Sequence, residues 1–166
     1  TVNGNPTRTP KGINSNKSQY LLMSPHGIYP TKGDDEWIAI SCRDDEDWNA
    51  LADVIQQTWT RKYLSISERI ENQDALDQDL SSWTQSQNKF ELQSLIRSIE
   101  VPASAVHKPQ DRIETDSSTE NFHLWPTVAH SEIGDVMVDG NPVHFSESDW
   151  QMNSGAPCLG EDNEKV

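Results

Sequence analysis

Histidine is the side chain best suited to acid–base chemistry near neutral pH, and one of the five histidines here lies in an unusual setting. Residues 24–27 read Ser-Pro-His-Gly, so His26 stands between a proline and a glycine. Glycine lets a backbone approach a ligand closely, and proline limits the conformations of the loop. Two interpretations stay open: a loop in which His26 and Gly27 line a binding site, or a tight turn that leads into a strand.

No other spacing in the sequence indicates a catalytic site. The histidines are scattered without the spacing of zinc ligands. Ser24 and His26 lie on alternate sides of the turn, which makes them a poor nucleophile and base. Phosphate-binding loops, dinucleotide-binding glycine motifs and nucleophile elbows are absent from the sequence. From its motifs alone, we expect no catalytic residue and no metal ligand in this chain.

An acidic run at residues 44–47 precedes the clearest helical pattern in the chain. Carboxylates at a helix N-terminus accept hydrogen bonds from free backbone N–H groups and interact favourably with the helix dipole. We therefore interpret the run as a helix cap and not as a metal site.

The elements around His26 and Gly27 form an α+β pattern. Apolar runs predict antiparallel strands over 27–30 and 37–42, and a return strand over 101–106. Apolar residues at spacings of three and four predict three helices, over 44–59, 72–84 and 88–99. We expect these elements to form a small α+β domain over residues 24–106.

The remainder of the chain is polar and rich in turn residues. Residues 1–23 are predicted to be an extended arm or linker. Residues 107–166 are predicted to be C-terminal strands and a tail: 107–121 is turn-prone, and strands follow at 124–130 and 135–146. Asp139-Gly140 is a hairpin signal and predicts a β-hairpin there.

Composition restricts the class of protein. Only 33% of the residues are hydrophobic, against the ~45–50% usual for globular domains, although six tryptophans supply large apolar side chains. We therefore expect an incomplete core, as in part of a larger protein. The net charge of −14 argues against binding to nucleic acid or to anionic membranes.

The expected location is the cytoplasm, with mitochondria or peroxisomes as alternatives. Cys42 and Cys158 lie far apart, a pattern that fits a reducing compartment better than a disulfide framework. No hydrophobic run is long enough to span a bilayer, and no signal peptide is recognised.

Five short motifs occur in an order that resembles one protein family. They read GN at 4–5, SPHGIYPTKGDDEWIAI at 24–40, VPASAV at 101–106, GNPVHFS at 140–146 and APCLGED at 156–162. In this order they resemble the family III CoA-transferases, also called the L-carnitine dehydratase and bile-acid-inducible family. The resemblance covers nearly the whole chain and corresponds to the C-terminal part of the family's usual sequence.

The resemblance implies a fold and a reaction. Family members have a Rossmann-like large domain joined to a smaller domain, and two subunits interlock, which implies a homodimer of the full-length protein. The small α+β domain would be followed by a C-terminal β-hairpin that joins the large domain. The implied reaction moves coenzyme A between an acyl-CoA and a carboxylic acid through an aspartyl-CoA intermediate. That aspartate would lie outside this chain, so the 166 residues alone are expected to be inactive.

The resemblance also implies substrate contacts near the histidine turn. His26 and Gly27, with Tyr29 beside them, would line the acyl or CoA pocket of the complete enzyme. No cofactor is implied, because the coenzyme A thioester is a substrate. Glu36 stands where the family more often has a basic residue, and Asp162 replaces a histidine. Both departures indicate a divergent member.

Other functions stay open beside the transferase. One alternative is an acyl-CoA racemase relative that shares the fold. Another is a non-catalytic interaction or binding subunit of the same fold. A third is an acidic interaction domain whose match to the family motifs arises by chance.

Overall fold

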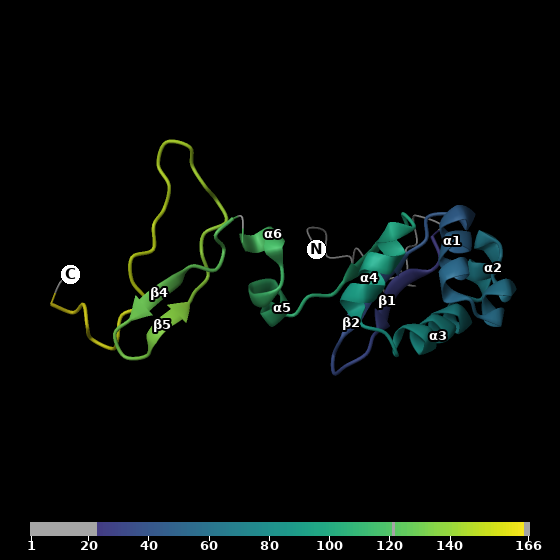
Figure 1. Cartoon of the computed structure of the whole chain (residues 1–166), viewed down its shortest axis with the longest axis horizontal. Coiled ribbons are helices and arrows are strands. Elements are labelled where there is room, and N and C mark those ends of the chain that lie inside the picture. The colour runs from purple at the N-terminus through teal and green to yellow at the C-terminus, as the bar shows by residue number, and fades with distance from the viewer. Residues whose placement is uncertain (1–22, 121, 165–166) are drawn as a thin grey trace, which may run out of the picture. The chain divides into compact units, whose positions relative to one another are not determined.

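The computed structural model describes residues 23–120 and 122–164, and the chain divides into two compact units, Thr1–Val106 and His107–Val166 (Figure 1). The predicted arm over residues 1–23 lies outside the described residues, apart from Met23. In the part of the chain that the structure describes, no helix combines the length and hydropathy needed to cross a membrane.

A three-stranded antiparallel sheet of order β1–β2–β3 lies at the centre of the first unit. Its strands are β1 (His26–Pro30), β2 (Trp37–Ser41) and β3 (Ala103–Ala105). β1 pairs with β2 across the charged turn, as the sequence predicted. The Thr31 N–H donates to the Glu36 carbonyl oxygen at 2.8 Å, and Gly33 has a φ of +125° that favours glycine.

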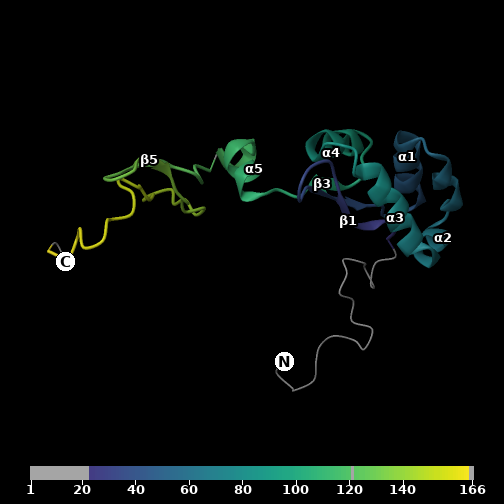
Figure 2. The ribbon, with the colours of Figure 1, turned by 90° about the horizontal axis from the view of Figure 1, so that it is seen from below.

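Helices follow the first two strands, and the three longest of them pack with the sheet around one core (Figure 2). They are α1 (Asp45–Ile55), the 3₁₀ helix η1 (Thr58–Lys62), α2 (Ile66–Glu71), α3 (Gln73–Thr84) and α4 (Lys89–Ser98). The three predicted helices are present. The first ends earlier than predicted, because Gln56 adopts a left-handed conformation with φ 53°. The prediction missed α2, whose Ser65 and Glu68 form a capping box.

The core of the first unit lies between the helices and one face of the sheet. Its most deeply buried hydrophobic residues come from strands and helices alike: Tyr29, Ile38, Ile40, Cys42, Trp48, Leu51, Leu76, Leu80, Leu92 and Ile96. Trp48 is completely buried, whereas Trp37 on the other face of β2 is 37% exposed. The buried apolar side chains of the first unit thus lie mainly on one side of the sheet.

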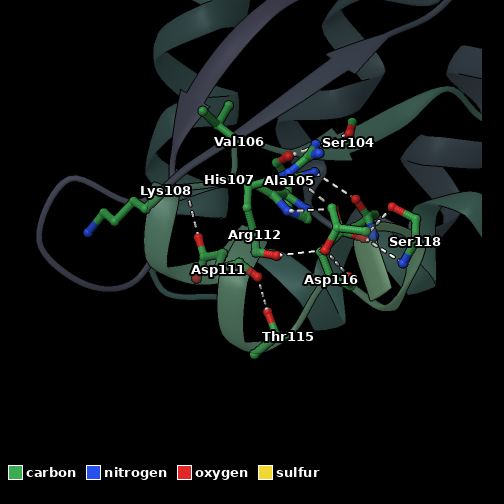
Figure 3. A network of polar contacts seen from close by, with 12 residues as sticks. Ser104, Ala105, Val106, His107, Lys108, Asp111, Arg112, Thr115, Asp116 and Ser118 are labelled. Atoms are coloured by element: carbon green, nitrogen blue, oxygen red, sulfur yellow. Dashed lines mark hydrogen bonds and ion pairs between the residues drawn. The ribbon is translucent and has the colours of Figure 1, made fainter. Parts of the chain in front are cut away.

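The second unit contains α5 (Pro109–Glu114), α6 (Ser117–Glu120), β4 (Thr127–His130) and β5 (Gly134–Met137). The prediction of a turn-prone segment over 107–121 was wrong, because two short helices form there. Pro109 occupies the start of α5, and the Lys108 N–H donates to Asp111 Oδ2 at 2.8 Å (Figure 3). Asp116 caps α6 by accepting from the Ser118 N–H at 3.1 Å.

The predicted hairpin at Asp139-Gly140 was also wrong. β4 pairs antiparallel with β5, so the chain reverses over residues 131–133 instead. The Gly140 N–H donates to the Leu124 carbonyl oxygen at 2.8 Å, and a Cβ at Gly140 would lie 2.8 Å from the Trp150 ring. Glycine at this position therefore provides room for packing and does not form a hairpin turn.

The second unit encloses little apolar volume. Within residues 107–120 and 122–164, Val128 is the only buried hydrophobic residue. Several large side chains are exposed: Phe122, Ile133, Met137, Val143, Phe145 and Leu159. Exposed apolar surface of this extent is typical of a segment that packs against other protein.

Candidate functional site

The candidate site lies on the open face of the three-stranded sheet, opposite the core. Alternate residues of a strand face opposite sides, and the register aligns them in rows across the strands. One row contains Ile28, Ala39 and Ser104, and the other contains His26, Ser41 and Pro102. Between these rows the backbone of Gly27, Ile40 and Ala103 completes the floor. Together with Arg97 these residues line a cavity of about 570 Å³.

Two of the three residues predicted to contact substrate, His26 and Gly27, line this cavity. His26 is half-buried at the start of β1. The sequence left open whether His26 belongs to a turn or to a binding site; the structure places it where the turn enters β1, and its side chain lines the cavity. Contact between these residues and a substrate stays a prediction.

Tyr29, the third predicted residue, faces the core and is not among the residues that line the cavity. Its hydroxyl donates to Asp77 Oδ1 at 2.8 Å. Burial and the neighbouring Asp77 carboxylate raise the pKa of Tyr29 well above its usual value. A Cβ at Gly27 would lie 2.9 Å from Tyr29 Oη. Glycine at position 27 therefore leaves room for the phenol ring, a structural reason independent of any ligand.

Arg69 fixes the turn that precedes His26. Its guanidinium is fully buried and lies 5.5 Å from the Trp48 ring centroid. Its partners are the carbonyl oxygens of Ser24, Asp44, Tyr63 and Leu64 and the carboxylate of Asp45. One side chain thereby connects the histidine turn to the start of α1 and to the segment before α2. A single sequence gives no signal for this role.

Side chains of α4 occupy the outer edge of β3. The Ala105 N–H donates to Gln93 Oε1 at 2.8 Å, and Arg97 Nε donates to the Ala103 carbonyl oxygen at 2.7 Å. Lys89, one turn before Gln93, donates to the Val106 carbonyl oxygen at 3.0 Å. Residues 89, 93 and 97 follow a four-residue spacing, so they form one stripe along the helix. These side chains make hydrogen bonds to the backbone groups at the outer edge of β3. They also bring the Arg97 side chain to the cavity.

The acidic run acts as a helix cap, as predicted. Asp44 Oδ1 accepts from the Asp47 N–H at 2.9 Å at the start of α1. Arg43 donates from Nε to Asp47 Oδ2 at 2.7 Å and holds the pKa of that carboxyl below its usual range. Within residues 23–120 and 122–164, no cluster of three or more metal-ligating side chains is found.

The two cysteines are both free. Cys42 is completely buried beside the sheet, and burial raises the pKa of its thiol to about 12. Cys158 is half-buried, and its Sγ lies 3.2 Å from Ser131 Oγ. Neither thiol lines the cavity on the open face of the sheet.

A small antiparallel sheet with helices on one face and a cavity on the other defines an α+β lobe. Residues 3–163 match CoA-transferase family III, and the chain belongs to this family. Among solved structures, a CaiB/BaiF family protein from Brucella suis superposes with a TM-score of 0.70 at 20% identity, over 88% of this chain and 37% of that one. The protein Rv3272 from Mycobacterium tuberculosis has a TM-score of 0.59 at 20% identity, over 85% of this chain and 39% of that one.

Two curated relatives are also similar in sequence. Probable CoA-transferase Rv1866 of Mycobacterium tuberculosis is 25% identical over 86% of this chain. Formyl-CoA:oxalate CoA-transferase of Streptomyces coelicolor is 29% identical over 72% of this chain. The alignments span only 18% and 29% of these two relatives, respectively. The predicted family and the α+β fold class are confirmed.

Proposed function

We propose that the protein containing this chain transfers coenzyme A between an acyl-CoA and a carboxylic acid. The family match over residues 3–163 is the observation that carries the proposal. Two relatives named as CoA-transferases support it. In this proposal, His26 and Gly27 line part of the pocket that receives the acyl group or coenzyme A. Tyr29 does not line this pocket; it lies on the core side of the sheet and occupies the space that a side chain at Gly27 would need.

The proposed chemistry uses an aspartate outside these 166 residues as the nucleophile. Its carboxylate oxygen attacks the thioester carbonyl carbon, and the carbon–sulfur bond breaks to give a mixed anhydride and the CoA thiolate. The thiolate attacks the aspartyl carbonyl carbon, which gives aspartyl-CoA and releases the donor acid. The acceptor carboxylate then attacks aspartyl-CoA and displaces the thiolate. Attack of the thiolate on the acceptor acyl carbon gives the new acyl-CoA and restores the aspartate.

Several carboxylates of the first unit have structural partners, which supports an external nucleophile. Asp45 and Asp47 are paired with Arg69 and Arg43. Asp77 and Asp79 accept from tyrosine hydroxyl groups, and neither carboxylate lines the cavity. A carboxylate held in such contacts is poorly placed to attack a thioester at the open face.

We further propose that the chain is the C-terminal part of a two-domain subunit that forms a homodimer. The chain covers only part of the length of each relative, and this supports the proposal. So do the exposed apolar side chains of the second unit, which would be covered by a large Rossmann-like domain. The 166 residues alone should then be inactive.

The test is an assay of the complete protein with a panel of acyl-CoA donors and carboxylic acid acceptors. CoA transfer is expected, and hydroxylamine should trap an activated aspartate only when an acyl-CoA is present. The 166-residue chain is the matched control and should neither turn over nor be trapped. Turnover by this chain alone would overturn the proposal that the nucleophilic aspartate lies outside it. Racemisation of the acyl-CoA without transfer, or binding without either reaction, would overturn the transferase function.

A further inference from the structure

The cavity on the open face has a largely apolar floor. Ile28, which is 45% exposed, lies beside Ala39 in one row, and Pro102 lies in the next. The apolar surface continues beyond the cavity through Trp37 and Val106, which are 37% and 39% exposed and are joined by a backbone hydrogen bond. A hydrocarbon group laid across these rows would release water from both surfaces.

Arg97 gives this apolar cavity a positive charge. Arg97 is exposed, and its Nε donates to the Ala103 carbonyl oxygen at 2.7 Å, which keeps the guanidinium at the β3 edge. Within residues 23–120 and 122–164, Nη1 and Nη2 of Arg97 have no hydrogen-bond or carboxylate partner. This is notable in a chain with 27 acidic and 13 basic residues. A guanidinium presents parallel N–H donors that match the two oxygens of a carboxylate.

We propose that this cavity binds a monocarboxylic acid with an apolar tail. The carboxylate accepts hydrogen bonds from the Nη atoms of Arg97, and the tail lies over Ile28 and Ala39. A volume of about 570 Å³ falls within the range of ~300–1,000 Å³ typical of small-molecule sites. The role of this acid as acceptor or acyl donor rests on the proposed function, whereas its binding requires no CoA chemistry.

The same geometry disfavours small dicarboxylates such as oxalate. Oxalate has no hydrocarbon chain to lie over Ile28 and Ala39, so it would gain none of the apolar contact that this floor offers. Oxalate appears in the name of the relative from Streptomyces coelicolor. The cavity therefore points to a different substrate class for the protein containing this chain.

The experiment is a titration of the ¹⁵N-labelled 166-residue chain, followed through the amide resonances of Ile28, Ala39, Ser41 and Ser104. Octanoate should shift these resonances to saturation, and neutral octanamide should bind about tenfold more weakly, because it loses a charge-assisted hydrogen bond. Removing CH₂ groups, from octanoate to hexanoate, should weaken binding by about two- to fourfold for each group. Oxalate should not saturate the same resonances.

Matched variants distinguish the contribution of the Arg97 charge to binding from that of the apolar floor. Arg97→Gln should weaken octanoate binding about tenfold and leave octanamide unchanged. The control is Arg61→Gln, which removes the same charge from an exposed residue of η1 and should have no effect. Ala39→Phe keeps Arg97 and fills the floor, so it should weaken octanoate and octanamide equally.

Equal affinities for octanoate and octanamide, or equal effects of the two arginine variants, would overturn the role of Arg97. Absence of saturable shifts with millimolar octanoate would overturn the acid site, even if the complete protein transfers CoA. Saturable binding that depends on Arg97 would support the acid site. If the complete protein then showed no CoA transfer, only the proposed function would be overturned.

Discussion

Arg69 Nε donates a hydrogen bond to the Ser24 carbonyl oxygen at 2.6 Å, although 45 residues separate the two in the sequence. The bond fixes the backbone just before His26, at the entrance to β1. The remaining nitrogens of Arg69 hold segments beside α1 and α2. A buried charge in the helical layer therefore helps to hold the histidine turn, together with the Cys42 N–H, which donates to the Pro25 carbonyl oxygen at 2.9 Å.

Replacing Arg69 with Met should destabilise the chain by about 3–5 kcal/mol. The substitution keeps an unbranched apolar stem but leaves the Asp45 carboxylate and several carbonyl oxygens without their donor. Urea unfolding followed by far-UV circular dichroism gives the free energy of unfolding. Arg61→Met, at an exposed residue of η1, is the matched control and should change it by less than about 0.5 kcal/mol. Similar losses in both variants would contradict the role assigned to Arg69.

Gly27→Ala should destabilise the chain by about 1–3 kcal/mol through crowding against Tyr29. The new Cβ would lie 2.9 Å from Tyr29 Oη and 3.1 Å from Cζ. Removing the hydroxyl in Tyr29→Phe should recover part of this loss, because the closest contact disappears. The measurement is a double-mutant cycle with Gly27→Ala, Tyr29→Phe and the double variant. Strictly additive free energies would show that Gly27 is not required by the Tyr29 ring.

The parts of the fold that could be predicted from the sequence are those set by local patterns. The antiparallel strands on either side of the Gly33 turn follow from apolar runs flanking turn residues. The start of α1 follows from the acidic cap at Asp44. The predicted hairpin at Asp139-Gly140 does not form; Gly140 instead lies close against the distant Trp150 ring, and the chain reverses between β4 and β5. Local sequence contains the turn signal but not the distant side chain that decides the outcome.

The candidate site was predicted only in part, for a similar reason. His26 and Gly27 stand out through neighbouring proline and glycine residues, and both reach the cavity. The face that Tyr29 occupies depends on strand register, and Arg97 reaches the cavity through the packing of α4 on the β3 edge. The roles of Tyr29 and Arg97 therefore became visible only when distant elements were placed together.

Cys42 should react with thiol reagents far more slowly than Cys158 at pH 8. Complete burial keeps reagents away, and a pKa raised to about 12 leaves the Cys42 thiol neutral. Ellman's reagent should therefore modify one thiol per chain in buffer and two in urea. Cys158→Ser is the control variant and should abolish only the fast reaction. Equal rates for both thiols in buffer would contradict the burial of Cys42.

Ionisation of the Cys42 thiol should lower the free energy of unfolding in alkaline solution. Because the folded chain retains the Cys42 proton to a higher pH than the unfolded chain, the stabilisation is complete below the ordinary pKa of 9.0 and is lost as the pH rises toward about 12. Tyr63, whose pKa is also raised to about 12, contributes in an overlapping range. The decline in unfolding free energy above pH 9 should therefore become shallower, without disappearing, in Cys42→Ala. An unchanged slope would contradict this linkage.

His144 should titrate above its ordinary pKa of 6.5. Its Nδ1 lies 2.8 Å from Asp149 Oδ2, and its Nε2 lies 2.9 Å from the Phe122 carbonyl oxygen. The carboxylate contributes most to the raised pKa, and the carbonyl oxygen also favours the protonated ring. The resulting stabilisation is complete below pH 6.5 and is lost as the pH rises through the folded pKa.

Asp149→Asn should lower the His144 pKa toward its ordinary value, because an amide cannot stabilise the protonated ring as a carboxylate does. The measurement is an NMR titration of the His144 ring. Glu147→Gln is the matched control: it removes a negative charge from an exposed neighbour that does not contact His144, so it should shift the pKa much less. Equal shifts in both variants would show that general charge, and not the Asp149 hydrogen bond, sets the titration of His144.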